Sequence, residues 1–395
     1  MNKGCDELPV RRTAMSPVIW LTCVLLTFSV TSHGTDGASD ISKPRSCIGA
    51  DSLRWRGATM RLENDLFTGT DHNYTNGVAF ALISEDIQGK PSPGCLPPGP
   101  RLLAGFLQRV DPGFWSDGED TEVARNLVVR FGQSMYTPED ETRTDLIADD
   151  RPYAGLLYLG LSWNRRFRPA DGHREVLDTR ELTVGVIGPW SLAEQSQDFI
   201  HRARGFDRFQ GWEHQLGNEP AFQLAAERKY RQASDGAIQP GWGHDLITSH
   251  ALRLGTIETS VSTKLEWRAG WNLPNDFGSY PIRPGAENRP PSTAGARDSR
   301  HMGSGTGPAP GVHAFLNLEA KAVARDFSLD GNLFRSSHSV TRRPWVAQAA
   351  AGISAQWLTA RRGFRLALMR VWRTREFDEQ VGHHAFGSVA LNVEF

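Results

Sequence analysis

The eight residues SVALNVEF (Ser388–Phe395) alternate between two kinds of side chain without a break. One set comprises Val389, Leu391, Val393 and Phe395, and the other comprises Ser388, Ala390, Asn392 and Glu394. Successive side chains of a β-strand point to opposite faces of the sheet. The stretch is therefore predicted to be a strand with one apolar face and one face that is mostly polar.

The same alternation recurs at residues 78–82, 157–163, 182–186, 314–324, 345–357 and 364–372. These segments run to about ten residues, which suits tilted strands that cross a membrane as a barrel. A soluble β-sandwich would alternate too, so alternation alone does not decide between them. A chain that ends on an aromatic residue of an alternating strand is similar to the closing strand of bacterial outer-membrane barrels. We therefore predict an all-β fold, a transmembrane antiparallel barrel.

The charge balance excludes one class of partner. The chain has 44 basic and 45 acidic residues, and its formal net charge is −1. A nucleic-acid-binding surface needs an excess of basic residues gathered on one face. We therefore expect no nucleic-acid partner.

The N-terminal segment has the layout of a secretory signal. Arg11 and Arg12 precede an apolar run at residues 17–30, and small and polar residues follow it. Such an order of basic, apolar and small residues is typical of a signal peptide. We expect cleavage between Ser32 and Ala38, and an uncleaved anchor remains the alternative.

The predicted organisation is a signal peptide at residues 1–36 and one barrel domain at residues 37–395. Cys47 and Cys95 remain after the signal is removed. Export to an oxidising compartment makes a disulfide between them feasible, but their positions in the sequence do not decide whether they pair.

Two segments rich in proline and glycine, residues 87–120 and 275–311, separate the alternating stretches. Both compositions are typical of flexible loops. Membrane barrels usually have their long loops on the extracellular side. We therefore expect both segments to be extracellular loops.

One helix interrupts the strand pattern. Ser191 and Glu194 have the spacing of a capping box, and residues 192–204 are predicted to be helical. Glu194, Gln197 and His201 then share one face of that helix. A helix in an all-β chain must lie on a loop or inside the barrel, which puts His201 near a rim.

Seven short motifs occur in a fixed order along the first part of the chain. They are E-N-D (63–65), Y-T-N-G (74–77), Y-T-P (136–138), D-R-P-Y-A-G (150–155), G-x-I-G-P (185–189), Q-x-F-I-H (197–201) and G-W-x-x-Q-L-x-N-E-P (211–220). In this order they resemble the outer-membrane lipid A deacylases, enzymes that remove the 3′-linked acyloxyacyl group of lipid A. The C-terminal half agrees mainly in strand pattern and in its terminal phenylalanine.

The resemblance implies a barrel of about twelve strands, with an active site between the outer rim of the wall and a helix from an extracellular loop. It implies calcium-dependent ester hydrolysis in which His201 is catalytic together with Asn64, Asp65 and Thr75. Asp65 would be the charged ligand of Ca²⁺. The family also uses a lysine after its Y-T-P motif; here the corresponding position falls on Arg143, which would bind substrate.

The chemistry suits these residue types. The sequence contains no G-x-S-x-G motif, so a serine nucleophile on such a turn is not supported. An unperturbed imidazole has a pKa of about 6.5 and can accept a proton from water near neutral pH. Gln197 or Asp198 could orient the ring of His201. Asp65 and Asn64 offer the oxygen ligands that Ca²⁺ takes.

The expected substrate is lipid A or lipopolysaccharide, and the expected location is the bacterial outer membrane, with the active site at the outer leaflet. We expect a monomer. Two alternatives remain open. One is an outer-membrane phospholipase, and the other is a non-enzymatic barrel that acts as a pore or adhesin.

Overall fold

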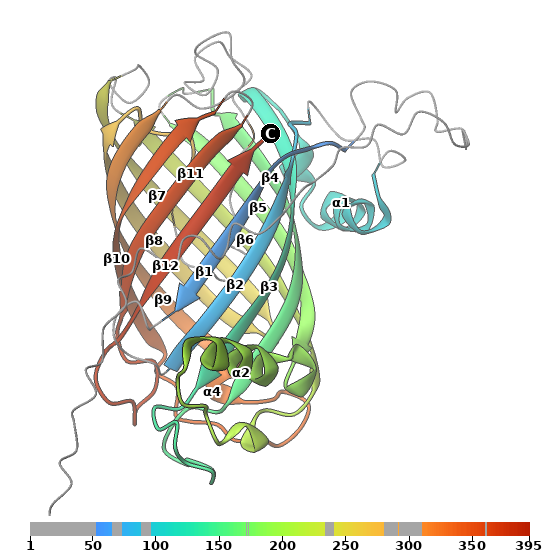
Figure 1. Cartoon of the computed structure of the whole chain (residues 1–395). Coiled ribbons are helices and arrows are strands. Elements are labelled where there is room, and N and C mark those ends of the chain that lie inside the picture. The colour runs from blue at the N-terminus through green and yellow to red at the C-terminus, as the bar shows by residue number, and fades with distance from the viewer. Residues whose placement is uncertain are drawn as a thin grey trace, which may run out of the picture. The chain divides into compact units, whose positions relative to one another are not determined.

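The computed structural model describes residues 53–64, 73–87, 96–170, 172, 174–233, 241–279, 291, 310–359 and 362–395. Twelve antiparallel strands in this part of the chain close into one barrel, in which β1 pairs with both β2 and β12 (Figure 1). This confirms the predicted fold class. The predicted signal peptide, Asp65, Cys47 and Cys95 lie outside the described residues.

The strands are β1 (Trp55–Asn64), β2 (Asn73–Ser84), β3 (Thr121–Thr137), β4 (Ala154–Arg168), β5 (Glu175–Ile187), β6 (Glu219–Ala233), β7 (Trp242–Gly255), β8 (Glu258–Trp271), β9 (Gly311–Asp326), β10 (Trp345–Leu358), β11 (Gly363–Arg373) and β12 (His384–Glu394). Among the described residues the α-helices are α1 (Pro98–Val110), α2 (Ala193–Arg204) and α4 (Phe327–Asp330). The same residues include three short 3₁₀ helices, η5 (Pro112–Trp115), η6 (Pro189–Ser191) and η7 (Trp212–His214). No helix in the described part is long and apolar enough to cross a membrane.

The two ends of the barrel are built differently. The start of β1 and the end of β12 lie at one end, which we call the terminal end, together with α1 (Figure 1). The opposite end, the α2 end, holds α2 and α4. Because neighbouring strands are antiparallel, β2 and β8 both end at the terminal end, and β3 and β9 both begin there.

The two proline-rich segments differ from the prediction in two respects. The strands that flank them end and begin opposite α2, so these segments and that helix cannot both be extracellular. The first segment also contains α1, which begins with prolines in its first turn, where the missing N–H costs no helical hydrogen bond.

The outer wall is apolar and the interior is polar. Large apolar side chains are exposed on the outside of nearly every strand, among them Phe80, Leu159, Val184, Phe222, Leu265 and Leu316. Exposed tryptophans occur near both ends of the wall, with Trp242 and Trp271 at the terminal end and Trp345 and Trp372 at the α2 end. An apolar band between two aromatic girdles is the surface that a membrane barrel presents to lipid.

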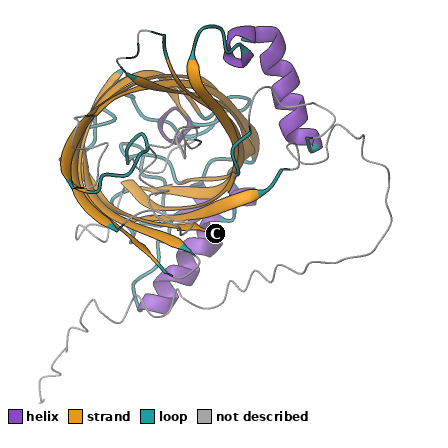
Figure 2. Ribbon diagram, turned by 90° about the horizontal axis from the view of Figure 1, so that it is seen from above, coloured by secondary structure: helices purple, strands orange, loops and turns teal. Residues whose placement is uncertain are grey.

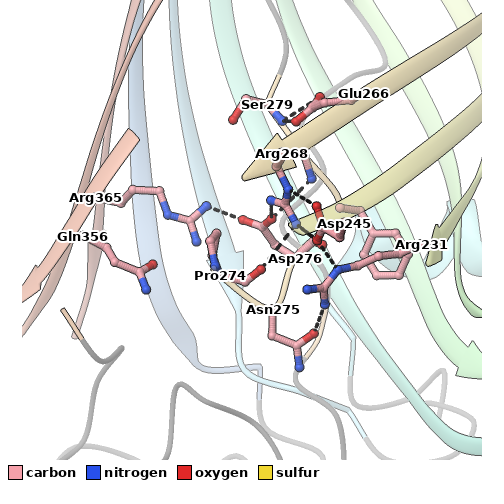
Figure 3. A network of polar contacts seen from close by, with 12 residues as sticks. Arg231, Asp245, Glu266, Arg268, Pro274, Asn275, Asp276, Ser279, Gln356 and Arg365 are labelled. Carbon is pink, nitrogen blue, oxygen red and sulfur yellow. Dashed lines mark hydrogen bonds and ion pairs between the residues drawn. The ribbon is translucent and has the colours of Figure 1, made fainter. Parts of the chain in front are cut away.

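The lumen is filled at the terminal end by the first residues after β8. The side chain of Arg268 on β8 donates to Asp245 on β7 at 2.8 and 2.6 Å and also contacts Asp276 (Figure 3). Arg365 on β11 reaches Asp276 from another side of the barrel (Figure 3). Phe277 is fully buried beside them.

Further strands contact the same segment. Arg166 on β4 donates to the Asn275 side chain at 2.6 Å, and Gln356 on β10 donates to the Asn272 carbonyl at 3.1 Å. Strands around the barrel therefore converge on residues 272–279, which we call the plug. Burial by itself raises the pKa of Asp276, but the two arginines hold it well below its usual range.

Candidate active site

Helix α2 lies against the outer face of the wall, over β3 and β4 at the α2 end. The Gln133 side chain on β3 donates to the carbonyl of Ser191 at 2.6 Å. Gly155 is the second residue of β4, and a side chain there would overlap Ser191 and Ala193. The glycine of the D-R-P-Y-A-G motif thus lets the start of α2 approach the wall. Figure 2, which looks down the barrel, shows the two long helices outside the ring of strands.

The predicted helix is confirmed and begins one residue later than expected, at Ala193. The predicted capping box was wrong, because the helix has no side-chain cap. The chain enters α2 through η6, and Leu192 adopts a left-handed conformation between them. Ser191 is fully buried beneath the helix start and does not cap it.

One face of α2 is buried and is anchored by Trp212. Ala193, Gln197 and His201, spaced four residues apart, are each 2% exposed or less. The indole N–H of Trp212 donates to the Gln197 side chain at 2.6 Å. Trp212 also packs with Tyr153, the tyrosine of the D-R-P-Y-A-G motif. The G-W and D-R-P-Y-A-G motifs therefore hold α2 in place.

The ring of His201 is oriented by the backbone after α2. Its Nδ1 lies within hydrogen-bond distance of the Asp207 carbonyl. A carbonyl oxygen can only accept, so Nδ1 carries the proton and the neutral ring has its lone pair on Nε2. The rings of Phe206 and Phe209 lie edge-on to the imidazole.

The two side chains proposed to orient this ring have other partners. Gln197 accepts from Trp212, and Asp198 pairs with Arg208 at 3.0 Å. The Asp207 carbonyl, which no side-chain motif could predict, is the contact at Nδ1.

Asn64 ends β1 on the outer face of the wall. Glu63 is fully buried toward the lumen, so Asn64, the next residue, shares the outward face with Leu62. Asn64 pairs with Asn76 on β2, and Asn76 pairs with Met135 on β3. Met135 belongs to the cluster of buried residues that includes Ala193 of α2. With strands about 4.8 Å apart, Asn64 lies about 10 Å along the wall from the residue that α2 covers.

Asn76 is a candidate that the sequence analysis missed. It is 8% exposed and lies between Asn64 and Met135 on the same outward row. The Y-T-N-G motif contains it, but only the register of β2 shows that it faces Asn64. Thr75 precedes it, where the pairing of β2 with β3 shifts register.

Arg143 lies on the connection between β3 and β4, at the α2 end. Its guanidinium contacts both carboxylate oxygens of Asp145, and this contact raises the pKa of Arg143 and lowers that of Asp145. The connection is joined to the segment after α2, because His214 contacts the Thr144 carbonyl at 3.0 Å. The predicted substrate-binding residue thus sits beside the site with a carboxylate partner.

The exposed side of the site is apolar. Trp190 of η6, Phe199 of α2 and Leu192 between these two helices are 53–69% exposed. They lie on the outside of the wall, where a membrane barrel meets lipid. Among the described residues, no three histidine, cysteine, aspartate or glutamate side chains cluster as a metal site.

A family model described as "Outer membrane protein LpxR" matches residues 21–395. The chain belongs to the LpxR family. This confirms the family that the ordered motifs predict, and the protein is an outer-membrane barrel.

The solved structure of LpxR from Salmonella typhimurium aligns with a TM-score of 0.58 and 16% sequence identity, covering 86% of this chain and 100% of that one. This likeness shows a shared fold. The β domain of the Bordetella autotransporter BrkA aligns with a TM-score of 0.36 and 10% identity, covering 88% of this chain and 99% of that one. No curated protein matches the chain.

Proposed function

We propose that this LpxR-family barrel hydrolyses the ester bond of the 3′-acyloxyacyl group of lipid A. The observation that supports this most is the position of His201, which lies on a helix packed against the outside of the wall and has its Nδ1 proton fixed by a backbone carbonyl. A base at that place serves a substrate that sits in the membrane beside the barrel. A base that faced the lumen would serve a solute.

His201 is the general base of this reaction. Its Nε2 takes a proton from a water molecule, and the resulting hydroxide oxygen bonds to the ester carbonyl carbon. The ester C–O bond then breaks, and the proton passes to the departing 3′ oxygen. The products are the acyloxyacyl acid and a 3′-hydroxyl group on the sugar.

Asn64 and Asp65 would hold the calcium ion. The chemistry of the donors fits, because the outward row offers the amide oxygens of Asn64 and its neighbour Asn76, and Asp65 follows directly after β1. Carboxylate and amide oxygens are the ligands that Ca²⁺ takes. When bound, Ca²⁺ supplies a Lewis acid that stabilises negative charge on the carbonyl oxygen.

Thr75 and Arg143 have supporting roles. The Thr75 hydroxyl would orient water, substrate or Asp65. Arg143 would bind an anionic group of the substrate, since a guanidinium can hold a phosphate through two parallel hydrogen bonds. The carboxylate of Asp145 already accepts from the guanidinium of Arg143, so an anionic group of the substrate must displace this carboxylate to bind there.

The plug argues against the pore alternative. Residues 272–279 occupy the lumen and contact β4, β6, β8, β10 and β11. A buried network with many partners does not leave the lumen readily. The exposed apolar residues beside α2 are compatible with either lipid A or a glycerophospholipid, so products must separate these two substrates.

Mass spectrometry of lipids treated with the purified, folded barrel and Ca²⁺ tests the proposal. We expect lipid A to lose one acyloxyacyl unit. Release of a single fatty acid from phospholipid, with lipid A intact, would instead assign a phospholipase. Intact lipids of both kinds would reject the hydrolase.

A further inference from the structure

Helix α1 covers part of the outer wall that lipid covers elsewhere. Its inner face, Leu103, Ala104 and Leu107, packs in a cluster with Leu127 of β3 and Trp163 of β4. Leu127 and Trp163 point outward from the barrel, yet both are fully buried. On the same strand as Trp163, outward-facing Leu159 is 43% exposed. The helix thus takes the place of lipid over this patch.

The outward side chains of β4 show the level at which α1 lies. Leu157, Leu159, Leu161 and Trp163 form the apolar part, and Arg165 follows as the first charge. Arg165 pairs with Asp120 at 2.6 Å. The neighbouring strands repeat the pattern, because Arg125 of β3 pairs with Asp117 and Arg180 of β5 pairs with Asp111 at 2.8 Å.

The three acidic residues, Asp111, Asp117 and Asp120, all follow α1 in the sequence, and α1 itself packs on the apolar side of the arginines. Leu161 and Leu182, which belong to the apolar part of the wall, contact the same cluster. The helix therefore lies at the depth where the apolar band gives way to charge.

The outer face of α1 is apolar as well. Leu102, Phe106 and Val110, spaced four residues apart, are 74%, 44% and 59% exposed. Arg101 and Arg109 are exposed beside this stripe. A soluble helix on a protein surface normally directs polar side chains outward. A helix at a membrane surface combines an apolar face with flanking arginines or lysines that meet lipid phosphates.

We propose that the stripe of Leu102, Phe106 and Val110 inserts into the lipid leaflet at the terminal end of the barrel, with Arg101 and Arg109 at the headgroups. The stripe continues the lipid-facing band of the wall. Three side chains provide far less area than the roughly 1,000 Å² that a specific protein interface needs, which argues against a second copy as the occupant. The inference does not depend on the proposed function.

Spin labels on single cysteines test this inference in the full protein with its four native cysteines replaced by alanine. Phe106→Cys and Leu102→Cys are the test positions. Leu159→Cys is the lipid-facing control, and Glu119→Cys, exposed beyond the arginines, is the water-facing control. Each labelled barrel is folded into vesicles of phosphatidylethanolamine and phosphatidylglycerol, and folding is checked by heat-shift gel.

Collisions with oxygen and with a polar nickel chelate then report the environment of each label. We expect the ratio of oxygen to nickel accessibility at both test positions to exceed that at Glu119 several-fold and to stay below that at Leu159, which lies deeper in the apolar band. A ratio like that of Glu119 would place the stripe in water and overturn the proposal. Shielding from both reagents would show that protein covers the stripe, and would also overturn it.

Discussion

The imidazole Nδ1 of His201 contacts the backbone carbonyl of Asp207, six residues further along the chain. The contact joins the second half of α2 to the loop that follows it, so the shape of that loop sets the tautomer of the ring. A substitution of Asp207 keeps the backbone carbonyl and therefore this contact, whereas a change that moves α2 breaks the contact.

Trp212→Phe removes the hydrogen bond to Gln197 and leaves a buried amide oxygen without this donor. Losing a buried hydrogen bond costs about 1–2 kcal/mol, which predicts roughly tenfold faster hydrogen exchange in α2. Hydrogen–deuterium exchange of residues 193–204, followed by mass spectrometry, measures the exchange rate in α2. Trp345→Phe, on the exposed wall, is the matched control and should leave exchange in α2 unchanged. Equal exchange in both variants would show that Trp212 does not hold the helix.

Gly155→Ala should displace α2 without unfolding the barrel, because the added methyl group overlaps Ser191 and Ala193. A catalytic group moved by about 1 Å can lose on the order of 100-fold in rate. Deacylation kinetics and a heat-shift gel check both parts of this prediction. Gly105→Ala, where the methyl group meets open space, should leave activity unaltered. Full activity of Gly155→Ala would contradict the packing argument.

Glu376 should make the barrel sensitive to acid. It lies between β11 and β12 and contacts Arg373 at 3.0 Å and Arg151 at 3.4 Å. Burial alone raises the pKa of this carboxyl, but the two arginines lower it to about 2. The folded pKa is thus below the unfolded value, so the contribution is complete above about pH 4.5 and is lost as the pH falls toward 2.

The shift corresponds to about 3 kcal/mol in the free energy of unfolding. Guanidinium unfolding in detergent measures the free energy of unfolding at pH 6 and at pH 3. Between these two pH values this free energy should fall less in Glu376→Gln than in wild type. Glu379→Gln, exposed on the same connection, should behave as wild type does. If the free energy of unfolding of Glu376→Gln falls as much as that of wild type, the acid sensitivity comes from other residues.

Chelation should abolish deacylation, and added Ca²⁺ should restore it. A site with one carboxylate and two amides binds weakly, since calcium affinity follows the number of charged ligands. Asn76→Ala should therefore raise the Ca²⁺ concentration required for half-maximal rate, while Asn73→Ala, on the same strand, serves as control. Activity that survives chelation would remove calcium from the mechanism.

The alternating strands were predictable because one face of each meets lipid. Among the strands that the alternation did not predict is β8, whose inward residues Lys264, Glu266 and Arg268 are charged, and a charged strand in the sequence looks like a solvated one. Only the closed barrel shows that these charges are buried and paired. Helix α1 was missed because its prolines and glycines are typical of a loop.

At the site, the residue pattern at 192–204 predicted the helix, and the order of the motifs predicted a role for His201. The outward direction of Asn64 depends on strand register, which sequence does not provide. Asn76 became a candidate only through its pairing with Asn64. The Asp207 carbonyl is a backbone group, and residue identity carries no signal for it.

The most direct test of the account is mass spectrometry of lipid A from cells that express wild type, His201→Ala or His383→Ala, with heat-shift gels to confirm folding. His383, an exposed histidine before β12, is the matched control. We predict loss of one acyloxyacyl unit in wild type and His383→Ala, and a rate lower by about 10²–10⁴-fold in His201→Ala. Deacylation by folded His201→Ala at the wild-type rate would contradict the assignment of the base.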